Sequence, residues 1–234
     1  MLAIYKRELR AYTNGVIGYA YMAFLLLFAG LICFYVNVLS GSSHFENTLE
    51  ILAVLLILAM PVLGMQSFSA ERRAGNARWL YSLPIRLYDV VLGKYLASLS
   101  IFSVVCVVLT AYPLLLRPFG MASLGVAYTS LLGFWLLGAA VLALCGFLSS
   151  LTEGAVASVL LSIGGTLLLY LFDLIASAIS QGAVASVVSA LSPFSRFAIV
   201  CDGAFDVTSV LYSVSFAAFF LYLTYQVMER KRRR

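Results

Sequence analysis

Long stretches without any charged residue are the feature that most limits how this chain can fold. Seven such stretches of 19 to 35 residues occur, at 11–43, 51–70, 95–116, 118–152, 154–172, 174–195 and 207–228. A helix needs about 20 apolar residues to cross the hydrocarbon core of a bilayer. Only 11% of the residues are charged, whereas a soluble domain has about a quarter. The sequence therefore predicts an all-α membrane protein with several spans.

The N-terminal segment 1–13 has the pattern of a helix that lies in the membrane interface. Its apolar side is formed by Leu2, Tyr5 and Leu9, and its basic side by Lys6, Arg7 and Arg10. The apolar run that follows is longer than the 7–15 residues typical of a signal-peptide core. We therefore expect the first span to stay in the protein as an anchor.

We predict six membrane spans. Their expected ranges are 16–39, 49–68, 95–116, 125–148, 155–178 and 207–228. Segment 179–206 is rich in serine and contains Ser192-Pro193, so a re-entrant or interfacial hairpin on the extracytoplasmic side is expected there. With both termini cytoplasmic, 13 of the 15 Lys and Arg residues lie inside. A seventh span would place the basic tail 229–234 outside, against the positive-inside rule.

Residues 66–94 form the long polar break in the first half of the chain. Within it, segment 70–84 has Trp79 and Leu83 at helical spacing, and Pro84 ends the helix because it disfavours the α conformation at the preceding residue. Two interpretations remain open. The segment is either a basic loop that fixes orientation, or a short amphipathic helix through which a soluble partner acts on the membrane part.

The sequence lacks the motifs of an enzyme. Its single histidine, His44, has no second metal ligand at a suitable spacing and is expected to be solvated in an outer loop. No zinc-protease, serine-hydrolase or phosphate-loop motif occurs. The four cysteines show no metal-binding spacing, and Cys201 is the one expected near water: Cys33, Cys106, Cys145 and Cys201. We predict no metal or cofactor on this chain, and an ATP-driven machine would need its ATPase on a separate chain.

Three charged residues near the ends of the predicted spans are candidates for function. Asp173 is an acid inside an apolar stretch, where ionisable residues often mark a substrate path. It either pairs with Arg196 or lines such a path. Glu153 lies in the predicted cytoplasmic hinge between the fourth and fifth spans, where it either stabilises a helix N-terminus or contacts a partner.

Several short elements resemble those of ABC-2 type permease subunits, and in particular the gliding-motility-type and nitrous-oxide-maturation-type branch. The elements are 5–10, 17–19, Pro61, 70–75, 83–84, 91–97, 149–152, 170–173 and 196–203. The glutamate, arginine and glycine of 70–75, the leucine-proline at 83–84 and the leucine-glycine-lysine at 92–94 are the most specific of them. The resemblance extends over essentially the whole chain.

The resemblance implies a type II exporter-like fold, in which 70–84 is a cytosolic coupling helix that contacts an ABC ATPase. The coupling residues that it implies are Glu71, Arg72, Arg73, Gly75, Arg78, Trp79, Leu83 and Pro84. Relatives usually have a glutamate where this chain has Arg78, so the partner's surface is expected to be acidic there. Two ATPase subunits would bind ATP and Mg²⁺, and two permease chains would form a homodimer or a heterodimer.

These observations predict a multi-pass permease subunit in the inner (cytoplasmic) membrane that exports an unidentified substrate. Membrane lipids and an extracytoplasmic accessory subunit are further expected partners, and nucleic acid is not. One alternative is an anchor that transmits ATPase motion to an extracytoplasmic protein. The other is a secondary transporter that works without an ATPase.

Overall fold

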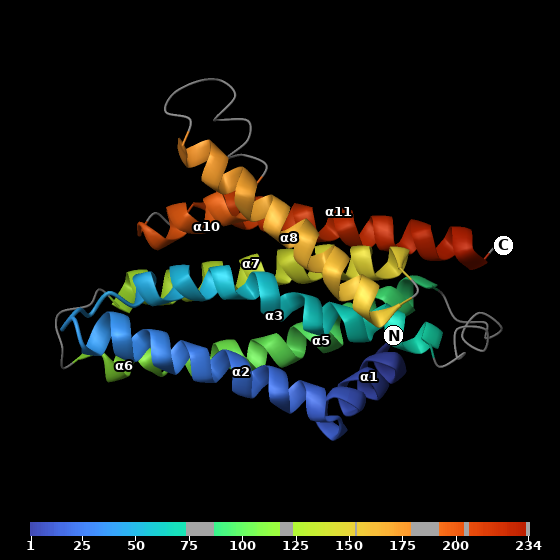
Figure 1. The fold of residues 1–234 in the computed structure, drawn as a ribbon, viewed down its shortest axis with the longest axis horizontal. Coiled ribbons are helices and arrows are strands. Elements are labelled where there is room, and N and C mark those ends of the chain that lie inside the picture. The colour runs from blue at the N-terminus through green and yellow to red at the C-terminus, as the bar shows by residue number, and fades with distance from the viewer. Residues whose placement is uncertain (74–86, 118–123, 153, 179–191, 204–205, 233–234) are drawn as a thin grey trace.

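The structure is a computed structural model that describes residues 1–73, 87–117, 124–152, 154–178, 192–203 and 206–232, without the side chains of 66–73 and 176–178. The secondary structure in these ranges is helical throughout. The helices are α1 (Leu2–Asn14), α2 (Val16–Cys33), the π-helix η1 (Phe34–Val38), α3 (Phe45–Arg73), α5 (Leu87–Leu109), α6 (Tyr112–Leu115), α7 (Leu124–Leu151), α8 (Ala155–Ala178), α10 (Pro193–Cys201) and α11 (Val207–Arg232) (Figure 1).

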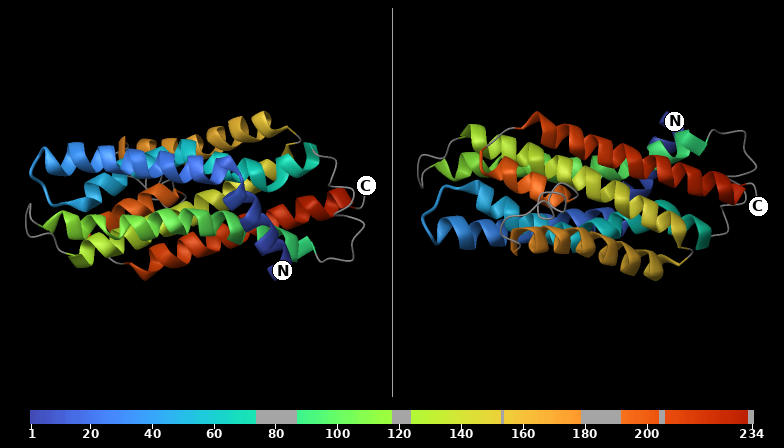
Figure 2. Two further views of the ribbon diagram at one scale, coloured as in Figure 1. Left: turned by 90° about the horizontal axis from the view of Figure 1, so that it is seen from below. Right: turned by 90° about the horizontal axis from the view of Figure 1, so that it is seen from above.

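Six membrane-spanning candidates occur among the described residues, which confirms the predicted all-α fold with six spans. They are Val16–Val38, Phe45–Met65, Leu87–Leu115, Leu124–Leu151, Ala155–Ile175 and Val207–Arg232. They run along the long axis of one bundle (Figures 1 and 2), and both chain termini lie toward the same end. We name this the terminal end and the opposite one the loop end.

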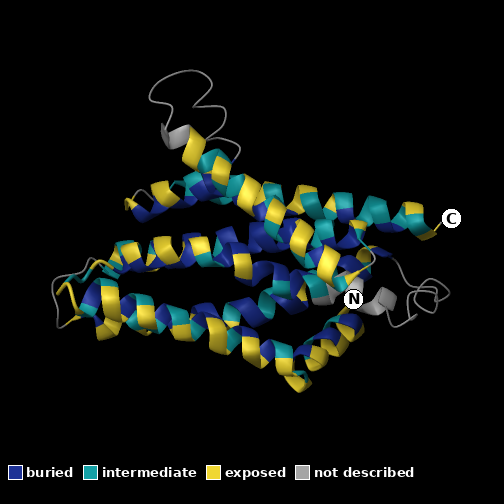
Figure 3. Cartoon of the chain, viewed as in Figure 1, coloured by how far each residue is buried: buried dark blue, intermediate teal, exposed yellow. Residues whose placement is uncertain are grey.

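Helices α3 and α7 form the centre of the bundle. Their apolar windows are 61% and 67% buried, compared with 17% for α8 and 22% for α11. Small residues allow the close packing: a side chain at Gly64 would lie 2.7 Å from Cys145 Cβ, and Gly138 faces the Phe102 ring. The exposed surface of the outer helices (Figure 3) is apolar, as in Leu160 and Leu211, which suits contact with lipid or another chain.

A buried asparagine closes the turn between α2 and α3. Asn37, in η1, donates from Nδ2 to the backbone oxygen of His44 at 2.9 Å. Thr48 Oγ1 donates to Asn37 Oδ1 at 2.5 Å. The amide therefore satisfies polar groups that cannot reach water, because Asn37 and Thr48 are both buried. The His44 side chain is solvent-exposed, as predicted.

Cys201 is buried, with 5% of its surface exposed, so the prediction that it lies near water is wrong. It belongs to α10, which packs against α7: the Phe197 and Phe134 ring centroids are 6.2 Å apart. The absence of a side chain at Gly133 lets Val200 approach α7 closely. These contacts turn the Cys201 face of α10 inward. Residues 179–191 of the predicted hairpin lie outside the described residues.

Helices α3 and α5 border the polar stretch of the sequence. The backbone of α3 continues without interruption to Arg73, so residues 70–73 prolong the helix that contains the second span. Helix α5 begins at Leu87, with Asp89 in its first turn. The remainder of the predicted coupling helix, 74–84, lies outside the described residues.

Candidate functional site

The predicted coupling residues divide into two groups. Glu71, Arg72 and Arg73 lie in the last turn of α3. The others lie outside the described residues, as does the predicted hinge residue: Gly75, Arg78, Trp79, Leu83, Pro84 and Glu153. The structure does describe the helices that surround the predicted coupling residues. These are α1, α3, α5, α7 and α11, which meet at the terminal end.

Helix α1 lies directly against the first turns of α5. A side chain at Gly93 would place its Cβ 3.1 Å from Ile4 Cγ2 and 3.4 Å from the backbone nitrogen of Tyr5. Glycine at this position therefore permits α1 to approach the α5 backbone. The N-terminal ammonium of Met1 is 3.9 Å from Asp89 Oδ2, which adds an ion pair at the start of α5.

An ion pair joins the same two helices one residue further along α5. Lys94 Nζ is 3.3 Å from Glu8 Oε1, and the Lys94 side chain is fully buried while that of Glu8 is 11% exposed. Arg7 Nη2 also lies 2.7 Å from Glu8 Oε1 from the exposed side of α1. A buried charge is tolerated only when it is paired and hydrogen-bonded. This pair therefore fixes α1 to α5 in a single register.

Tyr12 extends the connection to α3. Its hydroxyl donates to the backbone oxygen of Leu63 at 3.1 Å and lies 3.0 Å from Ser98 Oγ of α5. The Tyr12 side chain is buried. These hydrogen bonds are therefore shielded from water, and the low local dielectric strengthens them. One face of α1 thus contacts both helices that border the polar stretch.

Helices α5, α7 and α11 also meet at the terminal end. Leu87 and Val91 of α5 form an apolar cluster with Met228 of α11. Lys231 Nζ donates to the backbone oxygen of Ser150 at 2.8 Å, near the C-terminus of α7, where unpaired carbonyls favour a cation. We call these contacts, together with Glu8–Lys94 and Tyr12, the terminal junction.

The buried face of α1 matches the predicted apolar side in part, since Tyr5 and Leu9 are half-buried and pack against the core. The structure buries Ile4, Glu8 and Tyr12, while Leu2 is 67% exposed. The basic side is exposed as expected. Sequence reasoning missed Glu8 because an acid is not expected on the inward face of a helix. The available signal was the i, i+4, i+8 spacing of Ile4, Glu8 and Tyr12, together with a lysine next to glycine at the start of a span.

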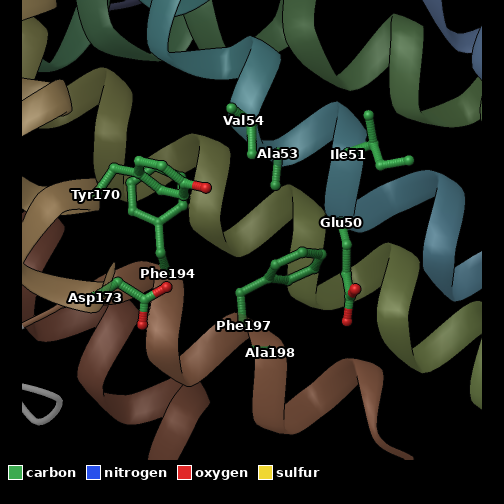
Figure 4. A pocket seen from close by; sticks show the side chains of 9 residues that line it. All are labelled: Glu50, Ile51, Ala53, Val54, Tyr170, Asp173, Phe194, Phe197 and Ala198. Atoms are coloured by element: carbon green, nitrogen blue, oxygen red, sulfur yellow. The ribbon is translucent and has the colours of Figure 1, made fainter. Parts of the chain in front are cut away.

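A pocket of about 330 Å³ opens toward the loop end between α3, α8 and α10. Its chemically distinctive lining residues are Glu50, Asp173, Tyr170, Phe194 and Phe197. Figure 4 shows the carboxylates of Glu50 and Asp173 on two sides of the Phe197 ring. Asp173, one of the candidate charged residues from the sequence, therefore lines a cavity.

Asp173 and Arg196 do not form the ion pair that the sequence suggested, judged over the described residues. Ser195 donates its hydroxyl to Asp173 Oδ1. The Arg196 guanidinium instead lies over the Tyr212 ring of α11, with its carbon 5.8 Å from the ring centroid. Successive helix residues point about 100° apart. Because Ser195 faces α8, its neighbour Arg196 faces α11.

Within the described ranges, no three His, Cys, Asp or Glu residues are grouped so that they could hold a metal ion. The fold is that of a multi-pass helical membrane protein with a polar junction at one end and a pocket toward the other. Residues 16–225 match the family described as ABC-2 family transporter protein. The chain thus belongs to the ABC-2 transporter family. No curated protein matches it significantly.

Membership of this family defines the general role of the chain. It is the membrane-spanning permease part of a transporter, which is not itself catalytic. Permeases of this family generally work with an ABC ATPase.

Proposed function

We propose that this chain is the permease subunit of an ATP-driven exporter powered by a separate ABC ATPase. Two permease chains, identical or different, would assemble with two ATPase subunits that bind ATP and Mg²⁺. The single observation that carries the proposal is the family match, which covers residues 16–225 of the 234-residue chain.

The distribution of basic residues supports an orientation with the terminal end in the cytoplasm. At this end α1 has Lys6, Arg7 and Arg10, and the last turn of α11 has Arg230, Lys231 and Arg232. Arg117 and Arg196 belong to the loop end. Basic residues are retained on the cytoplasmic side of a membrane. Both termini would therefore face the cytoplasm, and the chain would lie in the inner membrane.

The terminal junction supports a route for mechanical coupling. Residues 74–86 connect the end of α3 to Leu87 at the start of α5, so a force on them enters both helices. The Glu8–Lys94 pair ties α1 to α5. Closure of the ATPases on bound nucleotide would push on 70–84 and move α1 and α5 together. A packed junction with buried polar contacts transmits displacement because it resists local deformation.

Two finer assignments are supported by short sequence elements. The similarity of 70–75, 83–84 and 91–97 to gliding-motility-type and nitrous-oxide-maturation-type permeases favours that branch of the family. This branch resembles systems that carry an additional extracytoplasmic subunit. Such a subunit would contact the chain at the loop end. The substrate and that subunit are to be identified from the purified complex.

Co-purification tests the proposal directly. The tagged chain, extracted from its host in mild detergent, is expected to carry an ABC ATPase whose ATP hydrolysis depends on the permease. Glu71→Ala, Arg73→Ala and Arg78→Ala should leave membrane insertion intact and remove this dependence. Arg10→Ala is the matched control, because Arg10 is an exposed arginine of α1.

Other outcomes would support the alternative functions. Isolation without any ATPase, together with nucleotide-independent transport, would favour a secondary transporter and overturn the proposal. An ATPase-bound complex that retains an extracytoplasmic protein and moves no solute would favour an anchor that transmits motion. Unchanged ATPase assembly and hydrolysis in all three alanine variants would remove the assignment of 70–84 as the coupling element.

A further inference from the structure

The loop-end pocket has a charge that no base among the described residues neutralises. Among the described residues, Glu50 has no hydrogen-bond or ion-pair partner, and its carboxylate is exposed. Two further acids, Asp202 and Glu46, act on Glu50 through their negative charge. Arg196 is directed to Tyr212 on the far side of α10. The pocket therefore presents a negative potential.

Asp173 supplies a second carboxylate from the opposite side of the pocket. Ser195 donates to its Oδ1 and orients the group. Its other oxygen has no partner among the described residues. Two carboxylates borne by separate helices, α3 and α8, would repel an anion and attract a cation placed between them.

Aromatic rings and aliphatic side chains form the remaining walls. Phe194 and Phe197 are almost fully buried, and each is fixed by another ring. The Tyr170 and Phe194 ring centroids are 5.6 Å apart in an edge contact, and Phe197 packs on Phe134 at 6.2 Å. Ring faces attract organic cations, and fixed side chains require little ordering when a ligand binds.

We infer that this pocket binds a monovalent organic cation with an apolar body, its charged nitrogen or phosphorus between Glu50 and Asp173 and its body against Phe197. The volume of about 330 Å³ lies within the range of small-molecule sites. The phosphate of a lipid headgroup is disfavoured by the same two carboxylates. Binding of the cation at this pocket is independent of the proposed function. The further statement that this class of cation is the transported substrate rests on the proposed function.

Direct binding to the full chain tests the site. The chain is placed in phosphatidylcholine nanodiscs and titrated with tritiated tetraphenylphosphonium, with empty nanodiscs as the blank. We expect saturable binding that weakens at least fivefold in Glu50→Gln and in Asp173→Asn, and further in the double variant. The amide oxygen of an asparagine at 173 still accepts from Ser195, so the local structure is kept.

Asp206→Asn is the matched control, because Asp206 is an acid in the same extracytoplasmic region that does not line the pocket. Its affinity should stay within twofold of the wild type. Competition on the wild-type protein tests whether the charge of the ligand matters beyond its aromatic shape. The cation benzyltrimethylammonium should displace the probe, and the anion 3-phenylpropionate should not. Equal loss in Asp206→Asn, unchanged affinity in both pocket variants, or displacement by 3-phenylpropionate would each overturn the inference.

The assay contains no ATPase, so its result is separable from that of the coupling experiment. Saturable binding of the probe, together with a co-purification that recovers no ATPase, would retain the site and overturn the proposed function. An ATPase-coupled complex with no saturable binding of the probe would retain the function and overturn the site.

Discussion

Lys94 Nζ lies 3.3 Å from Glu8 Oε1, and the two residues belong to helices that are separated in the sequence by two membrane spans. The Lys94 side chain is fully buried, and Gly93 beside it provides the space in which α1 lies. The leucine-glycine-lysine element at 92–94 therefore has a structural explanation: the glycine admits α1 and the lysine holds it. The terminal junction depends on this relationship.

Removal of either charge should destabilise the protein, but unequally. Glu8→Gln leaves the Lys94 ammonium buried without that carboxylate, and losses of roughly 3–5 kcal/mol are typical for a broken buried pair. Lys94→Met should cost less, because Arg7 still contacts Glu8 at 2.7 Å. Unfolding of the purified chain in detergent measures both. The double variant should recover much of the loss, and strictly additive losses would contradict a direct interaction.

The size of the side chain at 93 should determine whether α1 can lie against α5. Gly93→Ala should be nearly neutral, because the gain in helix propensity of about 1 kcal/mol offsets a Cβ contact of 3.1 Å with Ile4. Gly93→Leu should cost about 1–3 kcal/mol by overpacking. Ile4→Ala should restore part of that loss.

Gly164→Leu is the control for this series, because Gly164 is an exposed helix glycine at which an added Cβ would have nothing within 4 Å. Its unfolding midpoint should not fall. A loss equal to that of Gly93→Leu would show that the cost arises from the glycine substitution itself rather than from the contact with α1.

Asp206 should contribute a pH-dependent part of the stability. It precedes α11 and accepts a hydrogen bond from the Thr208 backbone N–H at 2.9 Å, which lowers the pKa of its carboxyl. A lowered folded-state pKa stabilises the protein above the unfolded value of about 3.9, and this contribution is lost as the pH falls through the folded value.

The unfolding midpoint of Asp206→Ala should therefore lie below that of the wild type at pH 7, and the difference should shrink below about pH 4. Asp206→Asn keeps an N-cap acceptor, and its difference from Asp206→Ala should not vary with pH. Thermal unfolding at several pH values checks this. A difference between wild type and Asp206→Ala that is constant from pH 7 to pH 3 would contradict the assignment.

The proposed coupling role of Arg78 predicts the sign of the charge on the ATPase surface that it would meet. Arg78→Glu should reduce recovery of the ATPase with the tagged permease, and the loss should be smaller at high salt, where exposed charges are screened. Replacing the facing acid of the ATPase by lysine should restore recovery. Failure of every such acid-to-lysine change to restore it would contradict an acidic contact surface.

The number of membrane spans and their helical conformation followed from the sequence alone. Uncharged stretches about 20 residues long can satisfy their backbone hydrogen bonds in lipid only as helices. This requirement does not depend on neighbouring segments. The exposed basic side of α1 also followed from helical spacing, since charged side chains on that segment favour water. For the same reason His44 could be expected in solvent.

Contacts between distant segments could not be predicted in this way. Cys201 is followed closely by charged Asp202, yet α10 packs on α7 and buries it. Asp173 and Arg196 carry opposite charges near one end of the bundle, but the pitch of α10 directs Arg196 to Tyr212. The pocket lined by Glu50 and Asp173 requires helices from three parts of the chain to meet.

The sequence by itself determined a six-span helical membrane protein with a polar segment between its second and third spans, because hydrophobic length and helical periodicity are local properties. Only the tertiary structure decided which polar residues turn inward. Glu8 and Lys94 lie on the buried faces of α1 and α5 because each supplies the opposite charge that the other requires, and that compensation exists only when the two helices pack together.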